Sequence, residues 1–371
     1  YAYFKIKNKL DNLYFSFQSC EYILVMKILD TELNKSLIGK SLEDLECFSK
    51  SYGEPSFRGR QLFDWIYRKK TFDISLMTDL PQLFREKIKS TPIHPLKIVN
   101  TNNSFSKNTQ KYLFITDSGQ MIESVLMREA SRTTICLSTQ IGCAVDCDFC
   151  ATAKMGFIRS LTVGEIIDQF IQLEKLSITK VTNVVFMGMG EPFLNYKNSI
   201  AAAKLLNHSK GINFGAWRIT ISTAGIITKI KQFTHEKQPF KLAVSLNGSS
   251  QQQRLKIMPI TKKQTFIELL NAIREYTIQT RRRITIEYVL LEGVNDDISD
   301  ATILKEILRS IKCKLNIIPY NEIDSTYKRP IDKVIKSFHR FFKNASFPVT
   351  IRWSKGQDID AGCGQLVTHQ K

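Results

Sequence analysis

The sequence lacks any apolar run near the ~20 residues that a membrane-crossing helix requires. The run at residues 22–26 is short, and Glu21 and Lys27 flank it. A secretory signal, which needs a longer apolar stretch before small residues, is also missing. We therefore predict a cytoplasmic protein without membrane contact. The chain begins with Tyr1, and we predict that residues 1–25 are an extension outside the fold, with Met26 as a second candidate start.

Acidic residues are scarce, because 35 Asp and Glu stand against 53 Lys and Arg, which gives a formal charge of +18. Such an excess suits a polyanionic partner, since each cation that neutralises a phosphate releases counterions. A composition that simply favours Lys would give the same excess without any partner. The charge therefore favours nucleic acid binding but does not establish it.

Histidine is rarer still, with 5 residues, whereas part of the cysteine is clustered. Three of the 8 cysteines, Cys143, Cys147 and Cys150, lie close together in the sequence. Such spacing is typical of metal ligands rather than of a disulfide framework. The clustering and the chain length both indicate a reducing, intracellular setting.

The chain divides into a helical part and an alternating part. Short amphipathic helices are predicted over residues 41–90, a polar linker over 100–109, and a hairpin with strands at 111–116 and 121–126. From residue 133 onward, strands and helices alternate. The predicted strands are 133–138, 183–187, 218–222, 241–246, 284–290, 314–319 and 349–353, and the predicted helices are 162–176, 263–277, 300–310 and 333–343.

Repeated strand–helix units imply parallel strands joined by right-handed crossovers. Six units fit either an open doubly wound sheet or a partial barrel, and periodicity does not choose between them. We divide the chain into a helical accessory domain, 26–105, which would bind RNA, and a catalytic domain, 106–371.

The unusual segments of the alternating part follow its strands. In parallel α/β folds the reactive groups lie at the carboxyl ends of strands, so these segments would meet at one edge. They are residues 143–150 after the first strand, 188–192 after the second, 222–225 after the third, 245–247 at the end of the fourth, 319–321 after the sixth, and Cys363 after the last.

The CxxxCxxC spacing of Cys143, Cys147 and Cys150 is the strongest single signal. Three thiolates on a tight loop can bind three irons of a [4Fe-4S] cluster and leave the fourth iron open. An open iron can chelate S-adenosylmethionine (SAM) and pass it an electron, which yields a deoxyadenosyl radical. The alternative is structural zinc, but zinc needs four ligands and no nearby His completes this set.

Three further features each have two interpretations. In the sequence GMGEP at residues 188–192, the backbone and Glu191 could grip the amino group of SAM, or the glycines could simply form a tight turn. Cys363, which lies between glycines, and Cys136, which ends a strand, are by spacing alone either reactive thiols or small buried hydrophobes.

Two segments are candidates for RNA contact. Residues 57–70 interleave aromatic and basic side chains, which suits base stacking with phosphate contact but also fits an ordinary amphipathic helix. The arginine run at residues 281–283 precedes a strand, so it lies at the amino end, away from the expected active edge. We interpret it as a solvated or secondary contact.

Seven stretches then identify a family. They are GEPSFRGRQLFDWIY, CLSTQIGCAVDCDFCATAKMGFIRSLTVGEI, NVVFMGMGEPFLN, ITISTAG, LAVSLN, LNIIPYN and DIDAGCGQL, in this order from residue 53 to 366. In them the chain resembles the RlmN/Cfr family of radical SAM RNA methyltransferases, and GFIRSL and DIDAGCGQL resemble RlmN more closely than Cfr.

The resemblance implies an α/β fold, a partial (βα)6 TIM-like radical SAM barrel with a small helical N-terminal accessory domain. It implies a set of reacting groups: Cys143, Cys147 and Cys150 as ligands of the [4Fe-4S] cluster, Cys363 as the methyl-carrying cysteine, Cys136 as the second catalytic thiol, and Glu123 as a proton acceptor. The implied SAM-binding residues are Gly190, Glu191, Ser222, Ser245, Leu246, Asn247 and Asn321.

The implied reaction adds a methyl group to carbon 2 of an adenine in 23S rRNA, and the resemblance gives tRNA as a second candidate substrate. One SAM methylates Cys363, and a second SAM supplies the radical that takes hydrogen from this S-methyl group. The carbon radical adds to adenine, and attack by Cys136 on Cys363 releases the product and leaves a disulfide bond. An electron donor such as a flavodoxin or ferredoxin is implied, and we expect a monomer.

Three alternatives remain at this point. A Cfr-like enzyme would methylate carbon 8 of the adenine with the same cysteines. A radical SAM enzyme could instead act on a small molecule or a protein, which the charge and the helical module disfavour. The third alternative is a non-enzymatic RNA-binding protein with a structural zinc, which would not be brown as an iron–sulfur protein is.

Overall fold

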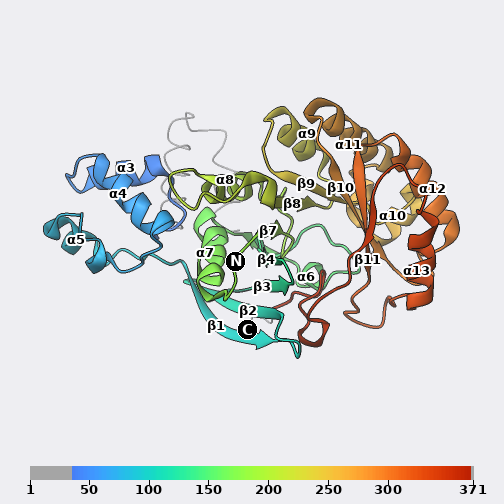
Figure 1. The fold of residues 1–371 in the computed structure, drawn as a ribbon, viewed down its shortest axis with the longest axis horizontal. Helices are drawn as coiled ribbons and strands as arrows, with labels where there is room; N and C mark the ends of the chain where they lie inside the picture. Colours follow the sequence, from blue (N-terminus) through green and yellow to red (C-terminus); the bar gives the residue numbers. More distant parts are fainter. Residues whose placement is uncertain (1–35, 369–371) are drawn as a thin grey trace, which may run out of the picture.

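A computed structural model describes residues 36–368 of the chain. The predicted extension, residues 1–25, lies outside the described residues. Figure 1 shows a small helical region beside a larger body in which helices surround a curved sheet. Within residues 36–368 we find no helix with the length and apolar character needed to span a bilayer.

The predicted helical module is present near the N-terminus. A capping box between Ser41 and Asp44 starts its first helix, because each residue's side chain accepts a hydrogen bond from the backbone of the other. Gly59 lets two helices touch, since a Cβ there would lie 2.4 Å from the Cα of Glu46. The helices are α3 Leu42–Ser51, α4 Phe57–Phe63, η1 Asp64–Arg68, η2 Ile74–Leu76 and α5 Gln82–Ile88.

Within residues 36–368 the main sheet has ten strands, in the order β1-β2-β3-β4-β7-β8-β9-β10-β11-β12. The first four pair antiparallel, and all pairs from β4 to β12 are parallel. The strands are β1 Leu96–Asn103, β2 Thr109–Thr116, β3 Met121–Glu129, β4 Arg132–Cys136, β7 Asn183–Phe186, β8 Ile219–Thr223, β9 Lys241–Ser245, β10 Ile284–Leu290, β11 Cys313–Pro319 and β12 Val349–Ile351.

The predicted strands are therefore confirmed, with ends that differ by at most three residues, and strand 284–290 matches at both ends. The linker predicted over residues 100–109 is wrong in part, because β1 extends to Asn103 and pairs with β2. This strand is at the edge of the sheet and most of its side chains are exposed. Its polar composition therefore resembles that of a loop, although its backbone completes the ladder.

Helices follow most of the parallel strands. Figure 1 shows α9, α11, α12 and α13 outside the curve of the strands. The sequence analysis gave no ranges for α8, α9 and α10, which the structure adds. The helices are α7 Val163–Leu176, α8 Tyr196–Asn207, α9 Ile227–His235, α10 Gln251–Ile257, α11 Phe266–Thr280, α12 Ile298–Arg309 and α13 Asp332–Phe341, with short turns α6 Ala151–Lys154, η3 Ala216–Arg218, η4 Pro259–Lys262 and η5 Gln357–Ile359.

The sheet is a partial barrel rather than a flat doubly wound sheet. Side chains from β3, β4 and every parallel strand through β12 line one common cavity, which a flat sheet could not enclose. Among the described strands β1 and β12 are the two ends of the order and do not pair with each other, so the barrel stays open. The partial (βα)6 barrel is thus confirmed.

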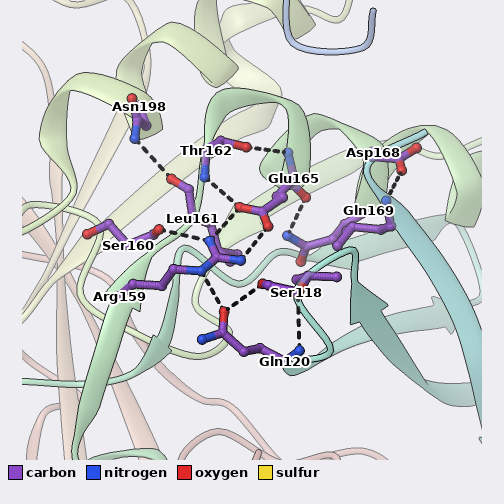
Figure 2. A network of polar contacts seen from close by, with 12 residues as sticks. Ser118, Gln120, Arg159, Ser160, Leu161, Thr162, Glu165, Asp168, Gln169 and Asn198 are labelled. Carbon is purple, nitrogen blue, oxygen red and sulfur yellow. Dashed lines mark hydrogen bonds and ion pairs between the residues drawn. The ribbon is translucent and has the colours of Figure 1, made fainter. Parts of the chain in front are cut away.

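A partly buried polar network fixes the start of α7 (Figure 2). The Arg159 guanidinium donates to both carboxylate oxygens of Glu165, at 2.7 and 2.8 Å, and Arg159 Nε donates to Gln120 Oε1. Glu165 also accepts from the backbone of Thr162, whose hydroxyl accepts from Glu165 N in a capping box. The network thus joins the β2–β3 turn to the segment that precedes α7.

We predict that Glu165→Gln lowers the free energy of unfolding by about 3 kcal/mol, because it leaves the Arg159 charge partly buried without its partner. The matched control is Glu306→Gln, which breaks an exposed ion pair with Arg309 at 3.8 Å and should cost less than about 0.5 kcal/mol. Urea unfolding of the variants measures both values. Equal losses for the two variants would contradict the role of the network.

Candidate active site

The three clustered cysteines lie on a loop enclosed by a small hairpin. This hairpin consists of β5 Gln140–Gly142 and β6 Phe157–Ser160, which pair antiparallel. Its base is tight, because a Cβ at Gly142 would lie 1.7 Å from the carbonyl oxygen of Gly156. Only glycine fits there, and the φ of +70° at Gly142 also favours glycine.

Cys143, Cys147 and Cys150 face one cavity of about 160 Å³ at the carboxyl ends of the strands. Burial raises the pKa of the Cys143 thiol to about 12, and that of Cys147 well above its usual value. Each thiolate also raises the pKa of its neighbours. A positively charged group bound between the three sulfurs would therefore stabilise their thiolate forms.

These residues fit a [4Fe-4S] cluster. Within residues 36–368 no group of three or more His, Cys, Asp or Glu side chains is arranged around a single metal ion. The three thiols instead surround a cavity, and a cluster takes its cysteine ligands at separate corners. The donor set is all sulfur, which suits an iron–sulfur group.

Most of the residues predicted to bind SAM line the same cavity as the cysteines. Leu246 does not, because its side chain is fully buried in the hydrophobic core. Its carbonyl instead accepts a hydrogen bond from Arg254 Nε. The predicted residues that line the cavity are Gly190, Glu191, Ser222, Ser245, Asn247 and Asn321.

Glu191 joins the loops that follow β7 and β8. One carboxylate oxygen accepts from Phe193 N at 2.9 Å and the other from Ala224 N at 2.7 Å. Burial raises the pKa of Glu191 to about 7, and the two backbone N–H groups partly offset this shift. A bound ammonium group would favour the ionised form.

Gly190 is required beside Glu191 for steric reasons. A Cβ at Gly190 would lie 2.4 Å from the Cβ of Gln140, and its φ is +92°. Gln140 Oε1 accepts from Glu191 N, so the close approach brings the loop after β7 against the hairpin of the cluster loop. The GMGEP turn therefore has a structural reason as well as the proposed binding role.

Cys363 lies in a segment that several hydrogen bonds tie to the barrel. Asn321 Nδ2 donates to the Cys363 carbonyl at 3.0 Å. The next residue, Gly364, accepts from Ala151 N at 2.7 Å, directly after the cluster cysteines. Farther on, the carbonyl of Leu366 accepts from the Thr152 hydroxyl. The C-terminal segment thus places Cys363 beside the cluster cavity.

Cys136 shares a second and larger cavity with Cys363. This cavity, of about 720 Å³, is the interior of the barrel, and both thiols line it. Burial and, to a smaller extent, the nearby Cys363 thiolate raise the pKa of Cys136 to about 12. Cys363 lines the cluster cavity as well, whereas Cys136 does not. Cys363 therefore stands at the junction of the two cavities.

The predicted disulfide bond is not present among the described residues, where Cys136 and Cys363 are both free thiols. The disulfide bond that the resemblance implies is therefore not supported by the structure. In the implied reaction the two sulfurs join only when the product leaves, so a reduced protein before turnover holds two thiols.

Arg352, directly after β12, is a functional candidate that the sequence did not reveal. It lines both cavities together with Cys363. The negative charges of a Cys363 thiolate, of Glu287 and of Cys136 raise the pKa of Arg352, against the effect of burial. Conversely, its positive charge offsets part of the rise in the pKa of Cys136. No motif marked this residue, since only the barrel brings it beside the two cysteines.

Glu123 lies apart from both cavities. Lys111 Nζ is 3.0 Å from Glu123 Oε1, and Val367 N donates to Oε2 at 3.0 Å. Burial raises the pKa of Glu123, and Lys111 opposes this shift. The carboxylate therefore holds the C-terminal segment four residues beyond Cys363, and its predicted role as proton acceptor stays a prediction.

The two candidate RNA segments differ in position. In residues 57–70, Lys69 Nζ lies 3.5 Å from the centroid of the Trp65 ring and Arg58 Cζ lies 4.6 Å from that of Phe57. Two of the cations in this segment therefore already contact aromatic rings of the same segment. Of the arginines at residues 281–283, Arg283 lines the barrel cavity, which the sequence did not predict.

Comparisons with known proteins agree with this geometry. Residues 137–303 match the radical SAM superfamily, and residues 35–93 match the ribosomal RNA large subunit methyltransferase N-terminal domain. The chain is 42% identical to the probable dual-specificity RNA methyltransferase RlmN of Thermotoga neapolitana, over 91% of this chain and 98% of that one. It is 40% identical to the protein of the same name from Geobacillus thermodenitrificans, over 89% and 92% of the chains.

A solved structure gives the same result. The crystal structure of a radical SAM methyltransferase from Sphaerobacter thermophilus superposes with a TM-score of 0.86 at 40% identity. The match covers 89% of this chain and 98% of that chain, so it includes the helical region and the barrel together.

Glu191 generates a pH prediction for the cluster-free protein. Its carboxyl has a pKa of about 7 when folded, above the ~4.3 of an unfolded chain, so folding favours the protonated form. The stabilisation is complete below about pH 4 and is lost as the pH rises to about 7. Over this pH range the free energy of unfolding of the wild type should fall by on the order of 3 kcal/mol relative to that of Glu191→Gln. Urea unfolding of both proteins at several pH values measures this difference. A constant difference between the two proteins would refute the shift.

Proposed function

This chain belongs to the RlmN family of radical SAM RNA methyltransferases, and we propose that it methylates carbon 2 of an adenine in 23S rRNA and in tRNA. The observation that carries the proposal is the position of Cys363, which lines both the cluster cavity and the barrel interior. A methyl group carried on this sulfur would pass from the cofactor side to the substrate side without leaving the protein.

Carbon 2 of adenine is electron-poor, so direct methyl transfer from SAM fails. A [4Fe-4S] cluster on Cys143, Cys147 and Cys150 would supply, with SAM, the radical chemistry that overcomes this barrier. The cavity that these cysteines line also contains the backbone of Gly190 and the carboxylate of Glu191, which would hold the SAM amino group.

Cys363 must be a thiolate to accept a methyl group. Arg352 lines both of the cavities that Cys363 lines, and its positive charge would stabilise that thiolate. Asn321, through its bond to the Cys363 carbonyl, would keep the segment in place while the sulfur carries the methyl group. Glu123 would act at a distance, by anchoring Val367.

Cys136 would complete the reaction from inside the barrel. Its sulfur would attack the Cys363 sulfur, so that an S–S bond forms and the bond from Cys363 to the methylene carbon of the product breaks. The two thiols share one cavity, as this step requires. A reductant then restores both thiols. The proposal further includes two SAM per turnover, an electron donor such as a flavodoxin or ferredoxin, and a cytoplasmic monomer.

RNA recognition would involve the helical accessory domain, which we propose to span residues 26–105. Its sequence between residues 57 and 70 interleaves aromatic and basic side chains, and Phe57 is 41% exposed. Exposed aromatic rings and cations suit unpaired bases and phosphates. The net charge of +18 supports a polyanionic substrate.

The test is the identity of the methylated base. Cluster-reconstituted protein would be incubated without oxygen with SAM, a reductant and unmodified 23S rRNA, and the digested RNA analysed by mass spectrometry against standards. We expect 2-methyladenosine, and tRNA treated in the same way should give the same product. Formation of 8-methyladenosine would instead support the alternative of a Cfr-like enzyme that methylates carbon 8. Cleavage of SAM without any methyladenosine would refute the RNA substrate.

A further inference from the structure

The barrel cavity that holds the two catalytic thiols is strongly basic. Six cationic side chains line it against two acidic ones. The cations are Arg132, Lys241, Arg283, Lys314, Arg352 and Lys355, and the acids are Glu129 and Glu287. The cavity is therefore suited to an anion, although the reaction itself needs only an adenine ring beside the thiols.

The cations and the thiols occupy opposite ends of the strands. Cys136 is the last residue of β4, whereas Arg132 is the first. Lys241 begins β9, Lys314 is the second residue of β11, and Arg283 directly precedes β10. Since these strands run parallel, the four cations gather at the amino end of the barrel.

These cations are not neutralised within the protein. Among residues 36–368, the one ion pair made by any of the six is Arg352 with Glu287, at 3.9 Å. Burial and the charge of Arg132 lower the pKa of Lys241. The pKa of Lys314 is lowered by burial and by the neighbouring cations, although Glu287 opposes this shift. Like charges held together without a partner favour binding of an anion.

An exposed tryptophan stands at the same end. Trp217 lies just before β8 and is 62% exposed. Lys241 Nζ lies 5.6 Å from the centroid of its ring, and Arg218 Cζ lies 4.7 Å from it. A large exposed ring beside unpaired cations is the arrangement with which proteins stack an unpaired base and hold the adjoining phosphates.

We propose that an amino-end rim, formed by Arg132, Trp217, Lys241, Arg283 and Lys314, binds the RNA strand next to the target adenine. The cations hold phosphates, and Trp217 stacks a flanking base. The adenine then enters the barrel from its amino end and meets Cys136 and Cys363 at the far end of the cavity. The inference rests on the proposed function, because it takes RNA as the substrate.

The rim also explains why there are two cavities. SAM and the cluster would occupy the small cavity at the carboxyl ends of the strands, and RNA would occupy the barrel interior from the opposite side. Cys363 lies where the two meet. The arginine run at residues 281–283, which the sequence placed away from the active edge, thus contributes Arg283 to substrate binding.

The test measures binding of a fluorescently labelled, unmodified tRNA transcript to the full chain by anisotropy at several salt concentrations. In the double variant Lys241→Ala/Lys314→Ala we expect the log–log salt slope to fall by about 1–2, since each lost phosphate contact removes about 0.7–0.9. The affinity at low salt should fall about tenfold or more. Trp217→Ala should weaken binding with little change of slope, and Trp217→Phe should restore it.

The matched control is Lys231→Ala/Lys336→Ala, which removes the same charge from exposed positions on α9 and α13 outside the cavity. If it weakens binding as much as the rim variant does, the rim has no special role and the inference fails. The inference also fails if the rim variants bind RNA as tightly as the wild type does. Binding of inorganic phosphate to the cavity would not rescue it in that case. Wild-type protein that binds RNA through the rim but forms no methyladenosine would refute the proposed function alone.

Discussion

The arrangement of the site depends on how the C-terminal segment is held across the barrel. Residues beyond β12 have no strand to fix them, yet Cys363 has to face the cluster cavity and the barrel interior at once. Asn321 and Ala151 donate hydrogen bonds to carbonyls of this segment, and Glu123 accepts one from its Val367 N; these bonds supply that constraint. Each comes from a different part of the fold, so the position of one sulfur depends on the whole barrel. Cleavage of SAM would not need this constraint, but methyl transfer through Cys363 would.

The cluster loop shows the same principle on a smaller scale. Its ends are joined by a hairpin that only Gly142 allows, and Gly190 brings the loop after β7 against it. The partly buried contact between Arg159 and Glu165 then ties the end of the hairpin to α7. The cysteines are therefore placed by backbone contacts rather than by a metal alone, which leaves a loop ready for its cofactor.

Sequence reasoning reached the parts of the site that are local. The spacing of Cys143, Cys147 and Cys150 is a local pattern, and the structure brings these three cysteines to one cavity. The alternation of strands and helices is likewise local, and the structure confirms it. Leu246 does not line the cluster cavity, because its motif ends a strand at which the side chain turns into the core, and its role in SAM binding stays a prediction. Arg352 and Arg283 were not assigned to the site at all. Their role comes from the barrel, which brings side chains of distant strands into one cavity, and no spacing along the chain encodes that.

The most direct test of the account is the fate of the RNA when Cys136 is replaced. If Cys363 carries the methyl carbon and Cys136 releases it, the variant Cys136→Ala, given SAM, reductant and RNA, should stop with RNA joined covalently to the protein. Denaturing gels would show the adduct, and mass spectrometry of its digest should locate the link at Cys363. A methylated Cys363 without any RNA adduct would contradict the assigned role of Cys136, and an adduct at another residue would contradict that of Cys363.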